Sequence, residues 1–301
     1  MSGPTLSGNG ESNFYDQGTG GSMPIQIKPS GQACGAEIRG VDLAKPLWAG
    51  EVEEIKEAWA AHHVLSFPDQ QLTDDDLETF TRYFGNLADE PFFRPIEGRR
   101  YIAAIARHAD EKTPIFAESW HSDWSFKEHP PIGTCLMGIT IPPHGGDTLF
   151  ANQHLAYQQM PNALKEKIDD LTAMHSAAAA YSPEGIYGRE DPALNRAMKP
   201  IISDEARATR AHPLVQRHPE NGKKAVYGCL GYTIGIEDMD EEQALALLAE
   251  LHQHQTSEAC IYRHQWQENM LIMWDNRSVL HRATGGFEGY DRLLHRTTIW
   301  P

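Results

Sequence analysis

The segment WHSDWSF, which runs from Trp120 to Phe126, places a histidine and an aspartate two residues apart between aromatic side chains. In an extended strand, side chains two residues apart leave the same face, so His121 and Asp123 would converge on one point. One imidazole nitrogen, one carboxylate oxygen and a third ligand would occupy one face of an octahedral metal ion. This 2-His-1-carboxylate arrangement is typical of non-haem Fe(II) oxygenases. We expect the third ligand on a distant strand, and His281 in WDNRSVLHRAT is the best candidate.

The C-terminal segment RLLHRTTIW adds two arginines that a strand would place on one face. This matters because an H-x-D pair is weak evidence by itself in a chain with 15 histidines. At about 3.3 Å per residue, Arg292 and Arg296 would stand roughly 13 Å apart, on the same face as Leu294. Burying an arginine is costly unless an anion pairs with it. We therefore predict two anion sites beside the metal; the alternative is two exposed arginines on an edge strand.

Hydrophobic periodicity predicts the elements that would position these side chains. Helical spacing of apolar residues predicts helices over residues 51–64, 72–85 and 240–255. Thr73 and Asp240 are the expected N-caps of the last two. Strand-like runs cover residues 132–141, 224–228, 270–274, 278–283 and 292–300. Helices come early and strands dominate the rest, which predicts a mainly β fold with flanking helices, either a β-sandwich or a jelly roll.

Composition indicates a globular protein and argues against several classes of partner. The 26 basic and 42 acidic residues give a net charge of −16, which disfavours nucleic acid and anionic membranes. No apolar run approaches the roughly 18 residues that a membrane span needs. The four cysteines form no C-x-x-C motif, so a cytoplasmic location fits best. We expect residues 1–22, rich in Gly and Ser, to be a disordered extension or a cloning remnant, and residues 23–301 to form a single domain.

Five segments occur in the order typical of one known family: WHSDWSF, PPHGGDTLFANQHLAYQQMP, HPLVQRHPENGKKAVYG, MWDNRSVLHRAT and DRLLHRTTIW. From about Ile25 to the C-terminus, the chain resembles the taurine dioxygenase-like (TauD/TfdA) enzymes, which are Fe(II)- and 2-oxoglutarate-dependent dioxygenases. The resemblance implies a double-stranded β-helix core (jelly roll, cupin-like). It implies that O2 and 2-oxoglutarate give succinate and CO2 while a small-molecule substrate is hydroxylated. We also expect a homo-oligomer, either a dimer or a tetramer.

The resemblance also implies roles for single residues. By this resemblance, iron is held by His121, Asp123 and His281, 2-oxoglutarate by Arg292 and Thr148, and an anionic group of the substrate by Arg296. A guanidinium–carboxylate pair with one additional neutral donor would fix the distal end of 2-oxoglutarate. Trp120, Asn152 and Asp275 also match family positions, and we expect packing or turn roles for them first.

Near the substrate pocket, the chain departs from the family pattern. Phe116 and Ala117 stand about where taurine-specific enzymes place polar residues, and Trp124 follows the carboxylate ligand where a small aliphatic residue is common. Where a histidine would help to hold a sulfonate, the loop FGNLADEPFFR offers Asp89 and Glu90. We expect Arg296, Trp124, Phe116 and Glu90 to contact the substrate. The changes favour a substrate bulkier or more apolar than taurine that keeps one anionic group: a sulfonate, sulfate ester, aryloxy acid or other carboxylic acid.

Several alternatives stay open at the level of sequence. The same iron site could serve desaturation or oxidative decarboxylation in a biosynthetic pathway. The chain could instead be a non-catalytic jelly-roll binding module, or the triad could hold zinc in a hydrolase. The long segment 175–210 has few motifs and is a candidate active-site lid or dimer contact.

Overall fold

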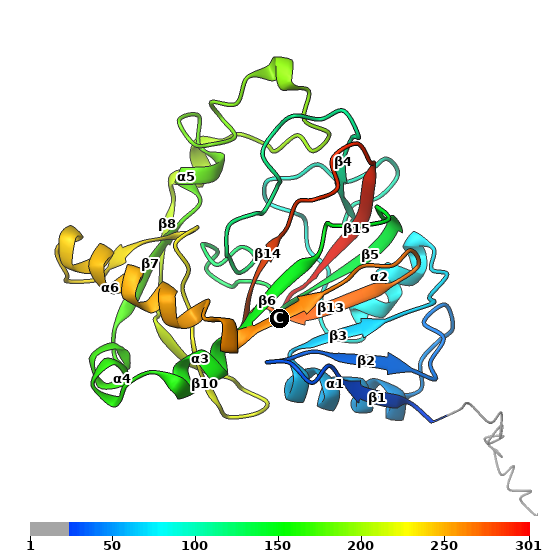
Figure 1. Ribbon diagram of the computed structural model, residues 1–301, viewed down its shortest axis with the longest axis horizontal. Helices are drawn as coiled ribbons and strands as arrows, with labels where there is room; N and C mark the ends of the chain where they lie inside the picture. Colours follow the sequence, from blue (N-terminus) through cyan, green and yellow to red (C-terminus); the bar gives the residue numbers. More distant parts are fainter. Residues whose placement is uncertain (1–23) are drawn as a thin grey trace, which may run out of the picture.

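A seven-stranded sheet dominates the computed structural model, which describes residues 24–301 (Figure 1). The strands follow the order β1-β2-β3-β13-β5-β15-β4, and every neighbouring pair is antiparallel except β2 and β3. Their bounds are β1 Gln26–Pro29, β2 Ala36–Arg39, β3 Val64–Phe67, β4 Ala103–Arg107, β5 Gly133–Thr140, β13 Leu271–Asp275 and β15 Arg292–Ile299. The predicted extension over residues 1–22 lies outside the described residues.

A second, three-stranded sheet packs against one face of the large sheet. It is antiparallel in the order β12 (Ile261–His264), β6 (Thr148–Asn152) and β14 (Val279–Ala283). Side chains that alternate along β13 divide between two cores, as a pleated strand requires. Ile272 and Trp274 pack with Phe150 of the small sheet, whereas Leu271 and Met273 belong to the core on the opposite face. Two packed sheets, antiparallel except for the β2–β3 pair, form the jelly roll that the sequence predicted.

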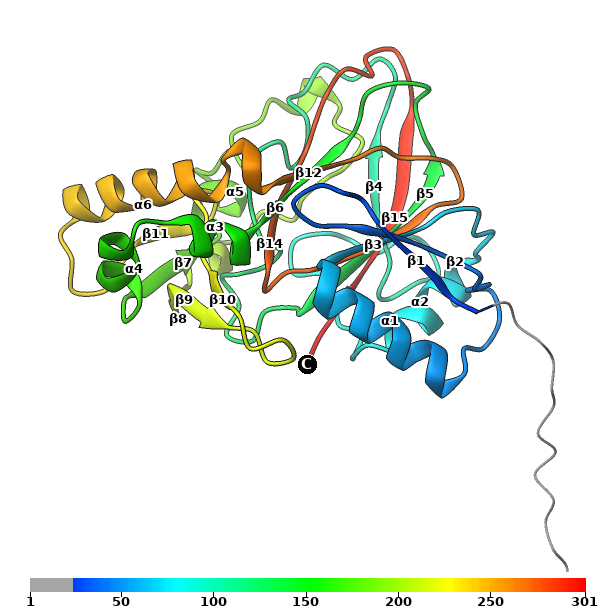
Figure 2. The ribbon, with the colours of Figure 1, turned by 60° about the horizontal axis from the view of Figure 1, so that its bottom comes forward.

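Two helices cover the outer face of the large sheet (Figure 2). They are α1 (Ala49–His62) and α2 (Asp74–Arg82), which lie close to the predicted ranges. The side chain of Thr73 accepts a hydrogen bond from the backbone N–H of Asp76 at 3.2 Å, which confirms the predicted N-cap. Ile55 and Trp59 of α1 pack into the outer core with Phe80 of α2. The helices therefore close one face of the sheet and leave the other face to build the site.

The remaining elements form a lobe beyond the small sheet, on the left in Figure 1. It contains α3 Gln153–Gln159, α4 Asn162–Ile168, α5 Ala178–Tyr181, α6 Glu241–Gln255, β7 Thr172–Ser176, β8 Thr209–Pro213, β9 Val215–Arg217, β10 Lys224–Val226 and β11 Thr233–Ile236. Asp240 caps α6 by accepting a hydrogen bond from the N–H of Gln243 at 2.9 Å, as predicted. No helix within residues 24–301 is long and apolar enough to cross a membrane.

Candidate active site

His121, Asp123 and His281 come together from two remote segments. An isolated antiparallel bridge joins the two histidine backbones, with N···O distances of 3.0 and 2.8 Å. Nε2 of each histidine lies 3.8 Å from Oδ1 of Asp123, and the three candidate ligand atoms lie within 4.8 Å of one another. Among the described residues, no other three His, Cys, Asp or Glu side chains are gathered in this way. The donor set of two nitrogens and one carboxylate oxygen fits one face of an octahedral metal ion.

The segment that carries Asp123 differs from the extended strand that the sequence predicted. Only His121 takes part in a bridge, and Asp123–Phe126 form a turn in which the N–H of Lys127 donates to the carbonyl of Trp124 at 2.9 Å. Trp124 adopts a φ of +50°, which is uncommon for a residue with a large side chain. The strand argument was therefore wrong about the backbone. The turn, not strand alternation, brings the side chains of His121 and Asp123 together.

Hydrogen bonds outside the triad orient its donor atoms. Nδ1 of His121 donates to the carbonyl of Ser119 at 2.8 Å, which leaves a lone pair on Nε2. Oδ2 of Asp123 accepts a hydrogen bond from the Thr134 hydroxyl at 2.6 Å, and that hydroxyl accepts one from Asn276 at 3.0 Å. With Oδ2 occupied in this way, Oδ1 is the oxygen that faces the two imidazoles.

The charge states of the triad also suit a divalent metal. Burial lowers the pKa of His281 to about 3, and burial is also the largest cause of the lowered pKa of His121. Burial alone would raise the pKa of Asp123, but electrostatic interactions with His281, Arg296 and His121 and the hydrogen bond from Thr134 outweigh it and lower the pKa overall. Two neutral imidazoles and one ionised carboxylate are the forms that coordinate a metal.

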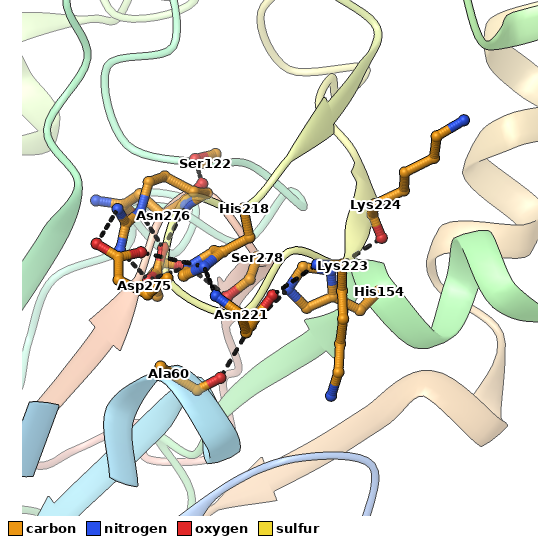
Figure 3. A network of polar contacts seen from close by, with 12 residues as sticks. Ala60, Ser122, His154, His218, Asn221, Lys223, Lys224, Asp275, Asn276 and Ser278 are labelled. Atoms are coloured by element: carbon orange, nitrogen blue, oxygen red, sulfur yellow. Dashed lines mark hydrogen bonds and ion pairs between the residues drawn. The ribbon is translucent and has the colours of Figure 1, made fainter. Parts of the chain in front are cut away.

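A buried polar network fixes the turn that leads from β13 into β14 (Figure 3). Nε2 of His218 lies 2.9 Å from a carboxylate oxygen of Asp275, and this carboxylate also accepts from the guanidinium of Arg277 at 2.6 Å. The hydroxyl of Ser122 donates to the carbonyl of Asn276 at 2.7 Å, which ties this turn to the segment between the first two ligands. Asp275 thus has the turn role that the sequence suggested.

Arg292 is a buried cation without a carboxylate partner. Its Nε has no hydrogen-bond partner, and Nη2 donates only to the carbonyl of Gly146 at 3.2 Å. Burial lowers the pKa of the Arg292 guanidinium to about 10. Asp147 opposes that shift, but its carboxylate is already paired with Arg263 at 2.8 Å. Because buried polar groups are normally satisfied, an orphaned guanidinium indicates a place for an anion.

A cavity connects Arg292 with the triad. His121 and His281 of the triad line it together with Thr148 and Arg292. The hydroxyl of Thr148 accepts a hydrogen bond from the indole N–H of Trp266 at 3.0 Å, so its own O–H remains to donate to an anion. A dicarboxylate held to a metal at the triad would therefore find a cation and a neutral donor for its second carboxylate.

A second cavity shares four lining residues with the first: Phe116, Ala117, His121 and Arg296. Most of its lining is apolar or aromatic, and includes Ile115, Phe116, Ala117, Trp124, Tyr181, Ile186, Tyr187 and Tyr232. Phe116 and Trp124 were predicted to contact a substrate. Tyr181, Tyr187 and Arg196 belong to the motif-poor segment 175–210, whereas Tyr232 lies outside it and carried no signal that sequence reasoning could have used.

Arg296 also lines this cavity, but it already has a carboxylate partner. Its Nη2 and Nε lie 2.6 and 3.1 Å from the two carboxylate oxygens of Glu90. The indole N–H of Trp124 donates to the same carboxylate at 3.0 Å. Glu90 was predicted to contact the substrate, yet it is not among the lining residues, because its carboxylate is turned into the protein against Arg296 and Trp124.

A jelly-roll fold that carries a 2-His-1-carboxylate group is typical of the non-haem Fe(II) oxygenases. Residues 26–298 match the model of the family described as "Taurine catabolism dioxygenase TauD, TfdA family", and the chain belongs to this family. It is an Fe(II)- and 2-oxoglutarate-dependent dioxygenase.

Individual relatives align with this chain over most of their length. The chain is 31% identical over 280 residues to an alpha-ketoglutarate-dependent sulfate ester dioxygenase from Pseudomonas putida, covering 92% of this chain and 90% of that protein. It is 32% identical over 296 residues to an alpha-ketoglutarate-dependent 2,4-dichlorophenoxyacetate dioxygenase from Cupriavidus pinatubonensis, covering 92% and 98%. A solved structure of AAD-2 in complex with Mn(II) and N-oxalylglycine superposes with a TM-score of 0.73 at 28% identity, covering 92% and 98%.

Proposed function

We propose that this chain hydroxylates a small organic substrate at an iron held by Nε2 of His121, Oδ1 of Asp123 and Nε2 of His281. The convergence of these three atoms where two cavities meet is the observation that carries the proposal. When bound, Fe(II) supplies the activation of O2 that the oxidative decarboxylation of 2-oxoglutarate requires. The residues of the chain bind and orient the reactants and exclude water from them.

In this proposal, Arg292 and Thr148 bind the distal carboxylate of 2-oxoglutarate. Support comes from the unpaired Nε of Arg292 and from the Thr148 hydroxyl, whose acceptor side is already used by Trp266. A bidentate guanidinium contact would satisfy the orphaned donor and fix the length and direction of the bound acid. The other end of the acid is then directed at the triad.

The second cavity receives the primary substrate. Two relatives are named for sulfate esters and for 2,4-dichlorophenoxyacetate. The first compounds to assay are therefore small molecules of that size and their uncharged analogues. Product analysis will distinguish hydroxylation from desaturation or oxidative decarboxylation. The proposal keeps a cytoplasmic location, which the four buried free cysteines support, and a homodimer or homotetramer, which light scattering will test.

The decisive experiment is anaerobic addition of Fe(II) and 2-oxoglutarate to the full chain, followed by visible absorption. A chelated keto acid gives a charge-transfer band, and Asp123→Ala should abolish it. Asp89→Asn is the control, because this exposed carboxylate pairs only with Arg100. A band that persists unchanged in Asp123→Ala contradicts the ligand assignment.

Turnover separates the remaining candidates. A non-catalytic binding module would form no succinate from 2-oxoglutarate in the presence of any substrate. A zinc hydrolase would act without O2 or 2-oxoglutarate.

A further inference from the structure

The buried ion pair between Glu90 and Arg296 lies beside the proposed metal site, and the proposed function gives it no role. Both carboxylate oxygens of Glu90 accept from Arg296, and the two side chains are only 1% and 6% exposed. This two-point contact is the one that an arginine makes with a carboxylate or sulfate ligand. Glu90 therefore occupies the position that an anionic group of a substrate would take on Arg296.

The protein holds Glu90 in this position with a third hydrogen bond. The indole N–H of Trp124 donates to the carboxylate from a residue whose φ is +50°. A backbone conformation that is rare for a bulky side chain persists only where the surrounding structure enforces it. Here Trp124 packs among aromatic rings that include Phe92, Phe93 and Phe126. The pair is thus a built feature of the site.

Little of Arg296 remains for a ligand. The rings of Phe93 and Trp124 lie 5.3 and 5.1 Å from its guanidinium carbon. Its remaining terminal nitrogen, Nη1, is 3.9 Å from Oδ1 of Asp123, the oxygen assigned to the metal. Nη1 makes no hydrogen bond to a described residue, but an anion that bound there would lie close to the carboxylates of both Glu90 and Asp123, on a guanidinium whose charge Glu90 already balances.

The other arginine of the substrate cavity is neutralised as well. Arg196 makes hydrogen bonds of 2.6 and 2.8 Å to the carboxylate of Glu190, and its Nη1 lies 4.0 Å from Glu111. Each arginine that lines this cavity therefore has a carboxylate partner, whereas Arg292 has none. The remainder of the lining is dominated by aromatic rings and aliphatic groups.

The charges of the loaded site lead to the same result. Fe(II) and Arg292 balance Asp123 and the two carboxylates of 2-oxoglutarate, and Glu90 balances Arg296. A neutral substrate leaves this buried centre neutral. A substrate carboxylate or sulfate would add an uncompensated negative charge in a dry pocket, which is strongly unfavourable.

We infer, on the basis of the proposed function, that the substrate is an uncharged molecule with an apolar body. Glu90 is the specificity-determining residue that selects it over anionic molecules of the same shape. Glu90 acts through Arg296 and has no part in the chemical step.

The test compares two probes that differ in charge and not in shape, phenoxyacetamide and phenoxyacetate. Their binding is measured by calorimetry on the full chain loaded with Mn(II) and N-oxalylglycine, so that no turnover is needed. Wild-type protein should bind the amide at least tenfold more tightly than the acid. Glu90→Gln, which keeps the side-chain shape, should strengthen acid binding at least tenfold and change amide binding less than threefold. Asp89→Asn, which removes the adjacent exposed carboxylate, should leave the ratio at its wild-type value.

Wild-type protein that fails to bind the amide more tightly than the acid overturns the inference, whether or not Glu90→Gln folds. An unchanged ratio in a folded Glu90→Gln protein overturns the role of Glu90. Failure of the proposed function looks different, because Mn(II) and N-oxalylglycine would then not bind at all in the loading titration.

Discussion

Strand β15 carries two buried arginines on one face, and the surroundings of their guanidinium groups differ. Arg292 keeps an unpartnered Nε, whereas Arg296 gives two donors to Glu90. Both side chains face the inner core, where Leu294 lies between them. An orphaned buried cation costs stability and is retained where a ligand completes it, while a paired cation is complete without a ligand. The comparison separates the proposed co-substrate site, where Arg292 lacks an anionic partner, from the proposed substrate site, where Glu90 already balances the charge of Arg296.

The largest effect should come from breaking the ion pair between Arg296 and Glu90. Arg296→Met leaves the carboxylate of Glu90 buried with only the Trp124 hydrogen bond. Removing one partner of a buried ion pair destabilises a protein by about 3–5 kcal/mol. Urea denaturation should therefore show a large loss in the free energy of unfolding. The double variant Arg296→Met with Glu90→Gln should recover part of that loss; if the two losses simply add, the pair is not energetically coupled.

The same substitution at Arg292 should weaken ligand binding and should not lower stability. Arg292→Met removes a cation that has no carboxylate partner, so the free energy of unfolding should stay constant or rise by about 1 kcal/mol. Affinity for N-oxalylglycine in the presence of Mn(II) should fall by about 2–4 kcal/mol, because the carboxylate loses its charged partner. Calorimetry and urea denaturation on the same variant check both parts. Loss of stability without loss of affinity would reverse the proposed difference between the two arginines.

The shared face of the two arginines could be predicted, but the contrast between them could not, and this has a physical cause. Strand alternation placed Arg292, Leu294 and Arg296 on one face, because a period of two is a local property of the chain. The partner of Arg296 lies 206 residues earlier, in a loop without periodicity, so no local pattern could indicate the pairing. The turn at Trp124 escaped prediction for a related reason, since positive φ at a bulky residue is imposed by tertiary packing.

The pH dependence of stability tests the surroundings of Arg292, because the neutral imidazole of His264 lies near this arginine. Burial, followed by the charge of Arg292, lowers the pKa of His264 to about 3 from an ordinary value of 6.5. Its folded pKa lies below its unfolded pKa, so its contribution is complete above pH 6.5 and is lost progressively as the pH falls toward 3. Between pH 8 and pH 5, this loss amounts to about 2 kcal/mol.

His264→Gln removes that titration and should make stability fall less steeply over this range. Urea denaturation at pH 8 and pH 5 gives the slope for each protein. His175, whose pKa burial also lowers to about 3, is still present in the variant, so part of the slope should remain. Equal slopes in wild type and His264→Gln would show that His264 is not held neutral.

The smallest effect should come from the residue next to Glu90. Asp89 pairs with Arg100 at 2.8 and 3.0 Å, but the two side chains are 61% and 70% exposed. Water and salt screen such a pair, and two long side chains lose entropy when they are held together. Asp89→Asn should therefore leave the urea midpoint unchanged, whereas Glu90→Gln should lower it. Asp89 and Glu90 are adjacent and both pair with an arginine, so burial would then explain the difference. An equal shift of the urea midpoint in both variants would mean that burial does not distinguish the Glu90–Arg296 pair.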